Sequence, residues 1–293
     1  MRTCLFTVVH AGSAPYFDEF LASLNKQTDL DFELLILNDA PSWQDSPSGE
    51  TKMAEQPFRW RWIDVTGSIV EIRKQGLSML RDEARADAVI FIDSDDLMAP
   101  NRVEICKANL KPREVLFNEL ILFGEGQTPY ALLKQHFLDG QELRLRDLTH
   151  SNCLGLSNTA LFVEDIMSRF QDIPDDTIAF DWAFFSGLLH DGCRARFISG
   201  TSTLYRQHAG NTASLVDIGD AQILRSVLVK AQHYRYLAGF DSDFSKLRTE
   251  FNHLQSKLAE DSAFRRAYRA HMRATSPTFS LWWENARLWE ESR

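Results

Sequence analysis

The sequence VIFIDSDD at residues 89–96 runs from an apolar strand directly into three carboxylates within four positions. Like charges this close repel one another unless they share a cation. Carboxylate oxygens are the ligands that Mg²⁺ or Mn²⁺ prefer, and such an ion completes its shell with water and substrate phosphates. A polar strand end in which Asp95 or Asp96 caps the next helix explains the same residues. Both interpretations place the acidic stretch at the end of a strand.

Around this stretch, short apolar runs alternate with segments of helical spacing. We expect strands over residues 5–9, 32–37, 58–65 and 88–92, and helices over residues 16–25 and 69–85. The alternation predicts an α/β fold, a mostly parallel sheet with helices on both faces. Ligands gather at the carboxyl ends of the strands in such sheets. The acidic stretch is therefore expected at a ligand site.

The remainder of the chain divides into a mixed part and a helical part. We expect helices over residues 100–110 and 180–190, strands over residues 115–123 and 196–205, and an apolar segment over residues 154–163. Beyond residue 214 the helical patterns 218–236, 244–258 and 264–272 follow one another without a strand. We predict a nucleotide-sugar-binding and catalytic domain over residues 1–215 and a helical appendage over residues 216–293.

The composition excludes several classes of protein. The chain has 293 residues and a net charge of -9, which argues against a nucleic-acid partner bound through clustered basic residues. Its four cysteines lie far apart without a CxxC pair, so we expect neither a zinc site nor disulfides, and a reducing cytoplasm fits best. No stretch approaches the ~18 apolar residues that span a bilayer, so any membrane contact would be peripheral, at the inner face.

Two motifs near the predicted sheet edge would suit a nucleotide. Asp39 ends the second predicted strand, where its carboxylate would accept a hydrogen bond from a nucleobase N–H, although the pair Asn38-Asp39 also suits a plain turn. Arg73 lies on the helix before the acidic stretch and would face a diphosphate. A solvated basic face is the usual meaning of such an arginine.

Two further motifs would suit catalysis and metal binding. Asp181 stands among apolar and aromatic residues in AFDWAFF at residues 179–185, and partial desolvation makes a carboxylate a better general base. A first-turn helix acid is the alternative. In YRQHAGN at residues 205–211, His208 would ligate a metal and Arg206 would meet phosphate, unless the segment is only a surface loop.

Taken in order, these motifs resemble the inverting family 2 glycosyltransferases with a GT-A fold, notably the rhamnosyltransferase-like branch. The resemblance spans residues 4–214. It is carried by FTVVH at 6–10, PYFDEFLASL at 15–24, QT at 27–28, ND at 38–39, Arg73 with GL at 76–77, FIDSDD at 91–96 as the DxD motif, DW at 181–182, and YRQH at 205–208 with Asn211.

The resemblance implies a role for each matched residue. It implies that Asp181 is the catalytic base, and that Asp95 and His208 bind Mg²⁺ or Mn²⁺, with Asp96 the alternative to Asp95. The implied contacts to the nucleotide sugar are His10, Ala11, Asp39, Arg73, Asp93, Ser94 and Arg206. VHA at residues 9–11 departs from the family's Pro-Thr-Tyr, and Asn38 and Ala40 replace the usual acid and glycine, so the nucleobase stays open.

The implied function is metal-dependent, inverting transfer of a sugar from a UDP- or dTDP-sugar to a hydroxyl of a glycan or lipid-linked acceptor, in surface glycan or polysaccharide synthesis. A sugar nucleotidyltransferase would need a cationic, Gly-rich phosphate loop after the first strand, and residues 10–14 offer no Lys or Arg. A non-catalytic nucleotide-sugar-binding module is a further alternative. Turnover that EDTA abolishes distinguishes it from an enzyme.

The C-terminal part is basic and aromatic. Residues 246–293 contain nine Lys and Arg against six Asp and Glu, a net charge of +3, and Trp282, Trp283 and Trp289 follow Arg265, Arg266, Arg269 and Arg273. Such residues bind anionic lipid surfaces. The same aromatics also pack helices onto the catalytic domain or a second subunit, and we favour packing because amphipathic helices more often face a core. We expect at most weak, salt-sensitive membrane binding; a homo-oligomer formed through these helices is left open.

Overall fold

The computed structural model describes residues 1–40, 52–83, 85–124, 128–166, 168–208, 219–277 and 280–289. Its strands are β1 (Thr3–His10), β2 (Glu33–Asp39), β3 (Arg59–Asp64), β4 (Ala88–Phe91), β5 (Leu97–Met98), β6 (Glu114–Gly124), β7 (Tyr130–Ala131), β8 (Glu142–Leu143), β9 (Thr159–Phe162) and β10 (Arg194–Gln207). Its helices are α1 (Phe17–Leu24), α3 (Ile69–Asp82), α4 (Arg102–Asn109), α5 (Phe180–His190), α6 (Asp220–Leu237), α7 (Ser242–Glu260) and α8 (Ser262–Thr275). Short 3-10 turns, such as η1 (Ala14–Tyr16), join these elements.

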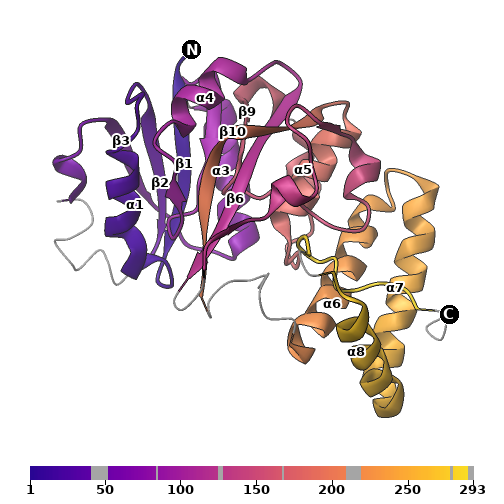
Figure 1. The fold of residues 1–293 in the computed structure, drawn as a ribbon. Coiled ribbons are helices and arrows are strands. Elements are labelled where there is room, and N and C mark those ends of the chain that lie inside the picture. Colours follow the sequence, from indigo (N-terminus) through magenta and orange to yellow (C-terminus); the bar gives the residue numbers. More distant parts are fainter. Residues whose placement is uncertain are drawn as a thin grey trace.

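The strands form one sheet in the order β3-β2-β1-β4-β9-β6-β10-β5, with β7 beside β6 and β8 beside β10 (Figure 1). The pairs β3–β2, β2–β1, β1–β4 and β6–β10 are parallel, while β9 runs antiparallel between β4 and β6. The predicted α/β fold with a mostly parallel sheet is confirmed. The carboxyl ends of β1, β2, β4 and β10 consequently meet at one edge.

Two apolar layers cover the two faces of the sheet. Leu5 and Val9 of β1 pack with Phe17 and Phe20 of α1, whereas Phe6 belongs to the layer of α3 and α5. This follows from the alternation of side chains along a strand. Burying each large apolar side chain stabilises the fold by about 1.5–3 kcal/mol. The helices therefore lie where the period-two pattern of the strands requires them.

The start of α3 is fixed by a capping box. The Ser68 hydroxyl accepts from Glu71 N at 3.3 Å, and the Glu71 carboxylate accepts from Ser68 N at 2.7 Å. The helix then passes very close to β1, because a Cβ added at Gly76 would lie 2.4 Å from the Phe6 Cζ. The first turns of α3, which carry Arg73, are thereby held at the carboxyl edge of the sheet.

After β10 the predicted helices are present as α6, α7 and α8, whereas the described residues beyond α8 are not helical. Helix α6 joins the sheet's own apolar core, and α7 and α8 pack beside it (Figure 1). The predicted boundary at residues 215 and 216 lies outside the described residues, so the division into two domains stays a prediction. None of the helices described is long and apolar enough to cross a membrane.

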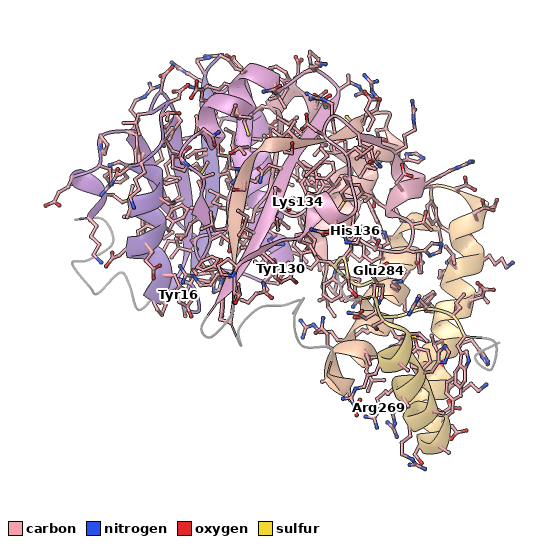
Figure 2. The ribbon with its side chains drawn as sticks, viewed as in Figure 1. Tyr16, Tyr130, Lys134, His136, Arg269 and Glu284 are labelled. Carbon is pink, nitrogen blue, oxygen red and sulfur yellow. The ribbon has the colours of Figure 1, made fainter. Side chains whose placement is uncertain are left out.

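The C-terminal segment, residues 280–289, returns from α8 to the sheet. Figure 1 shows it in yellow, and Figure 2 labels Glu284 on it and Arg269 on α8. The Trp282 carbonyl accepts from Asn152 N at 3.0 Å, the Ala286 carbonyl from Lys230 Nζ at 2.5 Å, and the Arg287 carbonyl from Tyr268 Oη at 3.0 Å. These bonds attach the segment to the catalytic part, to α6 and to α8.

Candidate active site

A cavity of about 490 Å³ opens at the carboxyl edge of the sheet. The residues of the predicted site that line it are His10, Ala11, Asp39, Arg73, Asp93, Ser94, Asp95 and Asp181. They come from the ends of β1 and β2, from α3, from the acidic stretch after β4, and from the first turn of α5. The topology thus brings together residues that are far apart in the sequence.

The acidic stretch presents its carboxylates in different directions. Burial raises the pKa of Asp93 to about 6, although the Arg73 charge opposes the rise. Asp96 is buried and accepts hydrogen bonds from the Ser157 hydroxyl and, at 2.7 Å, from Arg206 N. Burial also raises the pKa of Asp96 well above its usual range. Because Asp93 and Asp95 line the cavity and Asp96 is bonded to its neighbours, the geometry favours Asp95 over Asp96 as the metal ligand.

Arg206 and His208 lie behind the acidic stretch rather than in the cavity lining of the described residues. The Arg206 guanidinium donates to the Asp95 carbonyl at 2.8 Å and to Glu19 at 3.0 Å. It also stacks on the rings of Tyr16 and Phe123, with Cζ 4.4 and 4.6 Å from their centroids. Figure 2 labels Tyr16 near the foot of α1. Arg206 therefore supports the acidic turn, and its predicted contact with the donor stays a prediction.

His208 contacts Asp95, the residue with which it is predicted to bind a metal ion. Its Nε2 lies 2.9 Å from the Asp95 Oδ2, and its ring lies 5.2 Å from that of Tyr16. A carboxylate oxygen and an imidazole nitrogen, supplied by two separate strand ends, thus meet at one point.

His10 and Asp39 are neighbours across the parallel pair β1–β2. Burial lowers the pKa of His10, and the His10 Nδ1 accepts from Gly12 N at 3.1 Å, which indicates a neutral ring. Asn38 points elsewhere, because its amide donates to Asp64 at 2.8 Å while its oxygen accepts from Ala40 N at 3.2 Å. Asn38 and Asp39 end β2, the expected turn lies partly outside the described residues, and Asp39 lines the cavity.

Ser94 is a structural tie in the cavity wall. Its Oγ donates to the Val8 carbonyl at 2.8 Å and lies 2.7 Å from the Ser13 Oγ. The side chain is buried, so these bonds hold the acidic turn against the end of β1. The predicted donor contact of Ser94 stays a prediction.

Asp181 lies in the first turn of α5 and faces the cavity. Its Oδ1 accepts from Trp182 N at 2.8 Å, and its Oδ2 lies 3.5 Å from the Asn152 amide nitrogen. Burial raises the pKa of Asp181, and the Arg73 charge works against the rise. Asp181 is thus a first-turn helix acid, and this position is also compatible with the predicted role of general base. A raised pKa makes its carboxylate a stronger proton acceptor.

The Asp95 carboxylate and the His208 imidazole are groups of the kind that bind a divalent ion, but they are few. Within the described ranges, no group of three or more His, Cys, Asp or Glu is arranged to hold a metal. Asp95 and His208 form a pair. Burial raises the pKa values of Asp93 and Asp96 beside them, and the Asp95 charge adds to each rise. Mg²⁺ and Mn²⁺ need only one or two protein ligands when substrate phosphates supply the rest. Asp95 and His208 would hold such an ion.

Three aromatic residues of the cavity lining were not among the predicted site residues: Tyr205, Trp282 and Trp283. The sequence pattern favours helix packing or lipid contact for the two tryptophans. Side chains alternate along β10, and Arg206 faces α1. The same alternation could have predicted that Tyr205 points to the opposite face, toward the cavity. No local signal in the sequence places the tryptophans, since their position depends on how the C-terminal segment returns across the molecule.

Comparisons with known proteins agree with this architecture. The search of curated proteins finds no match, whereas residues 5–135 match the family model described as glycosyl transferase family 2. S. aureus TarS in complex with UDP has a TM-score of 0.59 at 15% identity, over 92% of this chain and 75% of that one. The Pyrobaculum calidifontis mannosyltransferase PcManGT in complex with GDP-Man and Mn²⁺ has a TM-score of 0.54 at 14% identity, over 93% and 79%.

GalNAc-T7 with UDP, GalNAc and Mn²⁺ has a TM-score of 0.57 at 10% identity, over 92% of this chain and 55% of that one. At such identities the likeness concerns the fold, and the family match concerns the segment from β1 to η3 (Leu133–Gln135). The matched segment contains the ends of β1 and β2 and the acidic stretch, which line one part of the cavity. Residues 5–135 thus match glycosyl transferase family 2, and the chain is a glycosyltransferase with a GT-A fold.

Proposed function

We propose that this glycosyltransferase is metal-dependent and inverting, and that it moves a sugar from a UDP- or dTDP-sugar to the hydroxyl of a glycan or lipid-linked acceptor. The observation that carries the proposal is one cavity lined by both Asp95, beside His208, and Asp181. A base for the acceptor and a site for the leaving diphosphate are the two aids that direct displacement needs. TarS bound to UDP-GlcNAc and PcManGT bound to GDP-Man and Mn²⁺ support a nucleotide-sugar donor and a divalent ion.

The donor is proposed to lie across the strand ends. Asp39 and His10, at the ends of β2 and β1, border the nucleoside side, and the acidic stretch after β4 follows next in the sheet order. Arg73 brings a positive charge toward Asp93 and Asp181, where it would meet the diphosphate. When bound, the divalent ion supplies charge neutralisation for the leaving diphosphate.

Asp181 is proposed to act on the acceptor. Its carboxylate takes the proton of the acceptor hydroxyl as the oxygen bonds to the anomeric carbon. The bond from that carbon to the diphosphate oxygen breaks in the same displacement, so the configuration inverts. The buried surroundings of Asp181 raise its pKa, which makes its carboxylate a better proton acceptor.

We place this activity in the cytoplasm, in surface glycan or polysaccharide synthesis. The four cysteines are free and buried, which suits a reducing compartment.

The first test removes the proposed metal ligand. Asp95→Ala is expected to lose the Mn²⁺-dependent part of UDP affinity, because the diphosphate charge is then left uncompensated. Calorimetry with UDP, with and without Mn²⁺, measures this, and Asp243→Ala on the exposed start of α7 is the matched control. Unchanged Mn²⁺-dependent affinity in Asp95→Ala would exclude Asp95 as a ligand.

A further inference from the structure

The C-terminal segment supplies one wall of the active-site cavity. Trp282 and Trp283 both line the cavity, and they are only 6% and 5% exposed. Trp283 has φ 66°, in the left-handed region that bulky residues rarely adopt. Such backbone strain is kept where the surroundings hold it, and it gathers at functional sites. The segment therefore places these indoles at the cavity rather than merely closing a core.

The contacts of Trp282 connect this wall to the proposed base. Its ring meets Tyr205 edge to face at 5.5 Å, and a Cβ added at Gly155 would lie 3.0 Å from its Cη2. Its carbonyl accepts from Asn152 N at 3.0 Å, and the Asn152 side-chain amide lies 3.5 Å from the Asp181 Oδ2. Asn152 is fully buried. One residue thus fixes the tryptophan segment and the base relative to each other.

The position of this wall along the sheet indicates which substrate it meets. Asp39 and His10 lie at the ends of β2 and β1, whereas Tyr205 belongs to β10, on the other side of β4 in the strand order. The tryptophans contact the β10 side. The acceptor hydroxyl must come within hydrogen-bond reach of Asp181. The acceptor, and not the nucleoside, is therefore the group placed nearest the tryptophans.

We propose that Trp282 and Trp283 form an aromatic platform that binds a pyranose ring of the acceptor beside Asp181. This rests on the proposed function of the site and narrows the acceptor to a sugar. Indole faces carry negative quadrupole density and are large and apolar, which suits the C–H face of a sugar ring while its hydroxyls reach polar neighbours. Among the described lining residues, the side chains that can carry positive charge are His10 and Arg73, and the Arg73 charge acts on Asp181.

The experiment uses simple ligands on the full chain. The probes are the methyl pyranosides of glucose, galactose, mannose, N-acetylglucosamine and rhamnose, with n-octanol and glycerol 1-phosphate as comparators for a lipid tail and a phosphate acceptor. Saturation-transfer NMR measures binding both with UDP and Mn²⁺ and without them. We expect at least one pyranoside to bind, with the strongest transfer to its ring C–H protons.

The variants separate the platform from the backbone that carries it. Trp283→Gly removes the indole and relieves the positive φ, so the segment keeps its course. It is expected to lower pyranoside affinity by about tenfold or more, as truncating a buried aromatic anchor does, with UDP affinity unchanged. Trp289→Phe is the control, because Trp289 stacks on His271 at 4.8 Å and is not in the cavity lining of the described residues. If Trp283→Gly does not fold, Trp282→Phe carries the same expectation with a smaller loss.

Three results of the binding experiment would overturn the aromatic platform. Pyranoside binding that both tryptophan variants leave unchanged overturns the platform, and so does a wild-type protein that binds octanol or glycerol phosphate but no pyranoside. Absence of all probe binding overturns it as well. Failure of the proposed function shows separately, as a wild-type protein that does not bind UDP with Mn²⁺, because the pyranoside titration is also run without nucleotide.

Discussion

Asp93 and Asp181 share a cavity and one positive neighbour, yet their surroundings suit them to different tasks. Both are desolvated, and Arg73 lowers the pKa of each against that effect. Asp93 additionally feels Asp95, which raises its pKa further and makes its charge one that a cation would stabilise. Asp181 instead stands at a helix start, with a backbone N–H bound to one oxygen and the other directed toward Asn152. Under the proposed function, Asp93 lies beside the donor and the Asp95 ligand, whereas Asp181 takes the proton of the acceptor.

Asp181→Asn is expected to lower the transfer rate by roughly 10²–10⁴-fold while UDP affinity stays the same, because an amide cannot accept the proton. Steady-state transfer assays and calorimetry measure the two quantities. The wild-type rate should fall as the pH drops through the raised pKa of Asp181, and the residual rate of the variant should lack that fall. Asp172→Asn, exposed in the turn η6 (Ser168–Asp172), is the control. A variant that kept most of its rate would require another base.

For individual residues, the sequence places the acidic side chains at the cavity but not its aromatic side chains. Asp39, Asp93 and Asp95 follow apolar runs, so parallel pairing alone brings them to one edge. Arg206 and Tyr205 differ by one position, and only the side-chain parity of β10 decides which of them faces the cavity. Trp282 and Trp283 follow three helices, and nothing local fixes the path back to β10.

Among the elements, α3 depends on one small residue for its distance from the sheet. Gly76 faces β1, and an added Cβ would lie 2.4 Å from the Phe6 Cζ and 3.0 Å from the Leu37 Cδ1. Helix α3 also carries Arg73 one turn earlier. The spacing between helix and strand therefore sets where the guanidinium lies in the cavity.

Gly76→Ala is expected to destabilise the protein by a net amount of up to about 2 kcal/mol, because overpacking a core usually costs about 1–3 kcal/mol. This exceeds the gain in helix propensity, which is about 1 kcal/mol. Denaturant unfolding measures the change, and Gln75→Ala on the exposed side of the same helix is the matched control. A more stable Gly76→Ala protein would show that α3 moves away from β1 without cost.

The elements also show where sequence patterns reach their limit. The strands and helices expected from apolar periodicity are present, and α3 and α5 begin at the predicted residues. The apolar segment 154–163 contains only the four-residue strand β9, which pairs antiparallel with both β4 and β6. Its direction depends on tertiary pairing, which a short apolar run does not encode.

Lys230 of α6 is a buried amine that donates a hydrogen bond to the C-terminal segment. Its Nζ donates to the Ala286 carbonyl at 2.5 Å, and burial lowers its pKa to about 7. The unfolded chain, with a pKa near 10.5, then binds more protons than the folded chain between about pH 7 and pH 10.5. Stability should therefore rise with pH across this window on account of Lys230.

Lys230→Met is expected to remove that rise. The unfolding free energy of the variant minus that of the wild type should therefore fall from pH 7 to pH 10.5. Denaturant unfolding at a series of pH values measures it. Lys246→Met, exposed on α7, should leave the wild-type dependence in place. A parallel pH dependence in Lys230→Met and wild type would show that the buried amine keeps its ordinary pKa.

For the molecule as a whole, the charge of the C-terminal helices is partly compensated within the fold. Arg269 and Arg273 both pair with Asp220 at the start of α6, at 3.0 and 2.9 Å, and Trp282 and Trp283 are buried. The predicted packing role of the aromatics thus has direct contacts, and fewer groups are left to meet a lipid surface.

We expect at most weak binding to anionic vesicles at low salt, and none at about 0.15 M salt, where screening acts beyond ~8 Å. Sedimentation with phosphatidylserine-containing liposomes at both salt concentrations measures it, with neutral liposomes as the control. Arg266→Glu, on the exposed face of α8, should abolish the low-salt binding. Strong pelleting that resists salt would contradict the assignment of the tryptophans to the protein interior.

The cavity combines side chains of β1 with side chains of the C-terminal segment, and this has a consequence for biosynthesis. A ribosome releases β1 early and residues 280–289 late, and domains begin to fold while synthesis continues. The strand ends that border the proposed nucleoside side can assemble before the tryptophan wall exists. We expect a nascent chain to gain nucleotide affinity before its acceptor side is complete. Transfer would begin only after residues 280–289 have left the exit tunnel and packed against the earlier part of the chain.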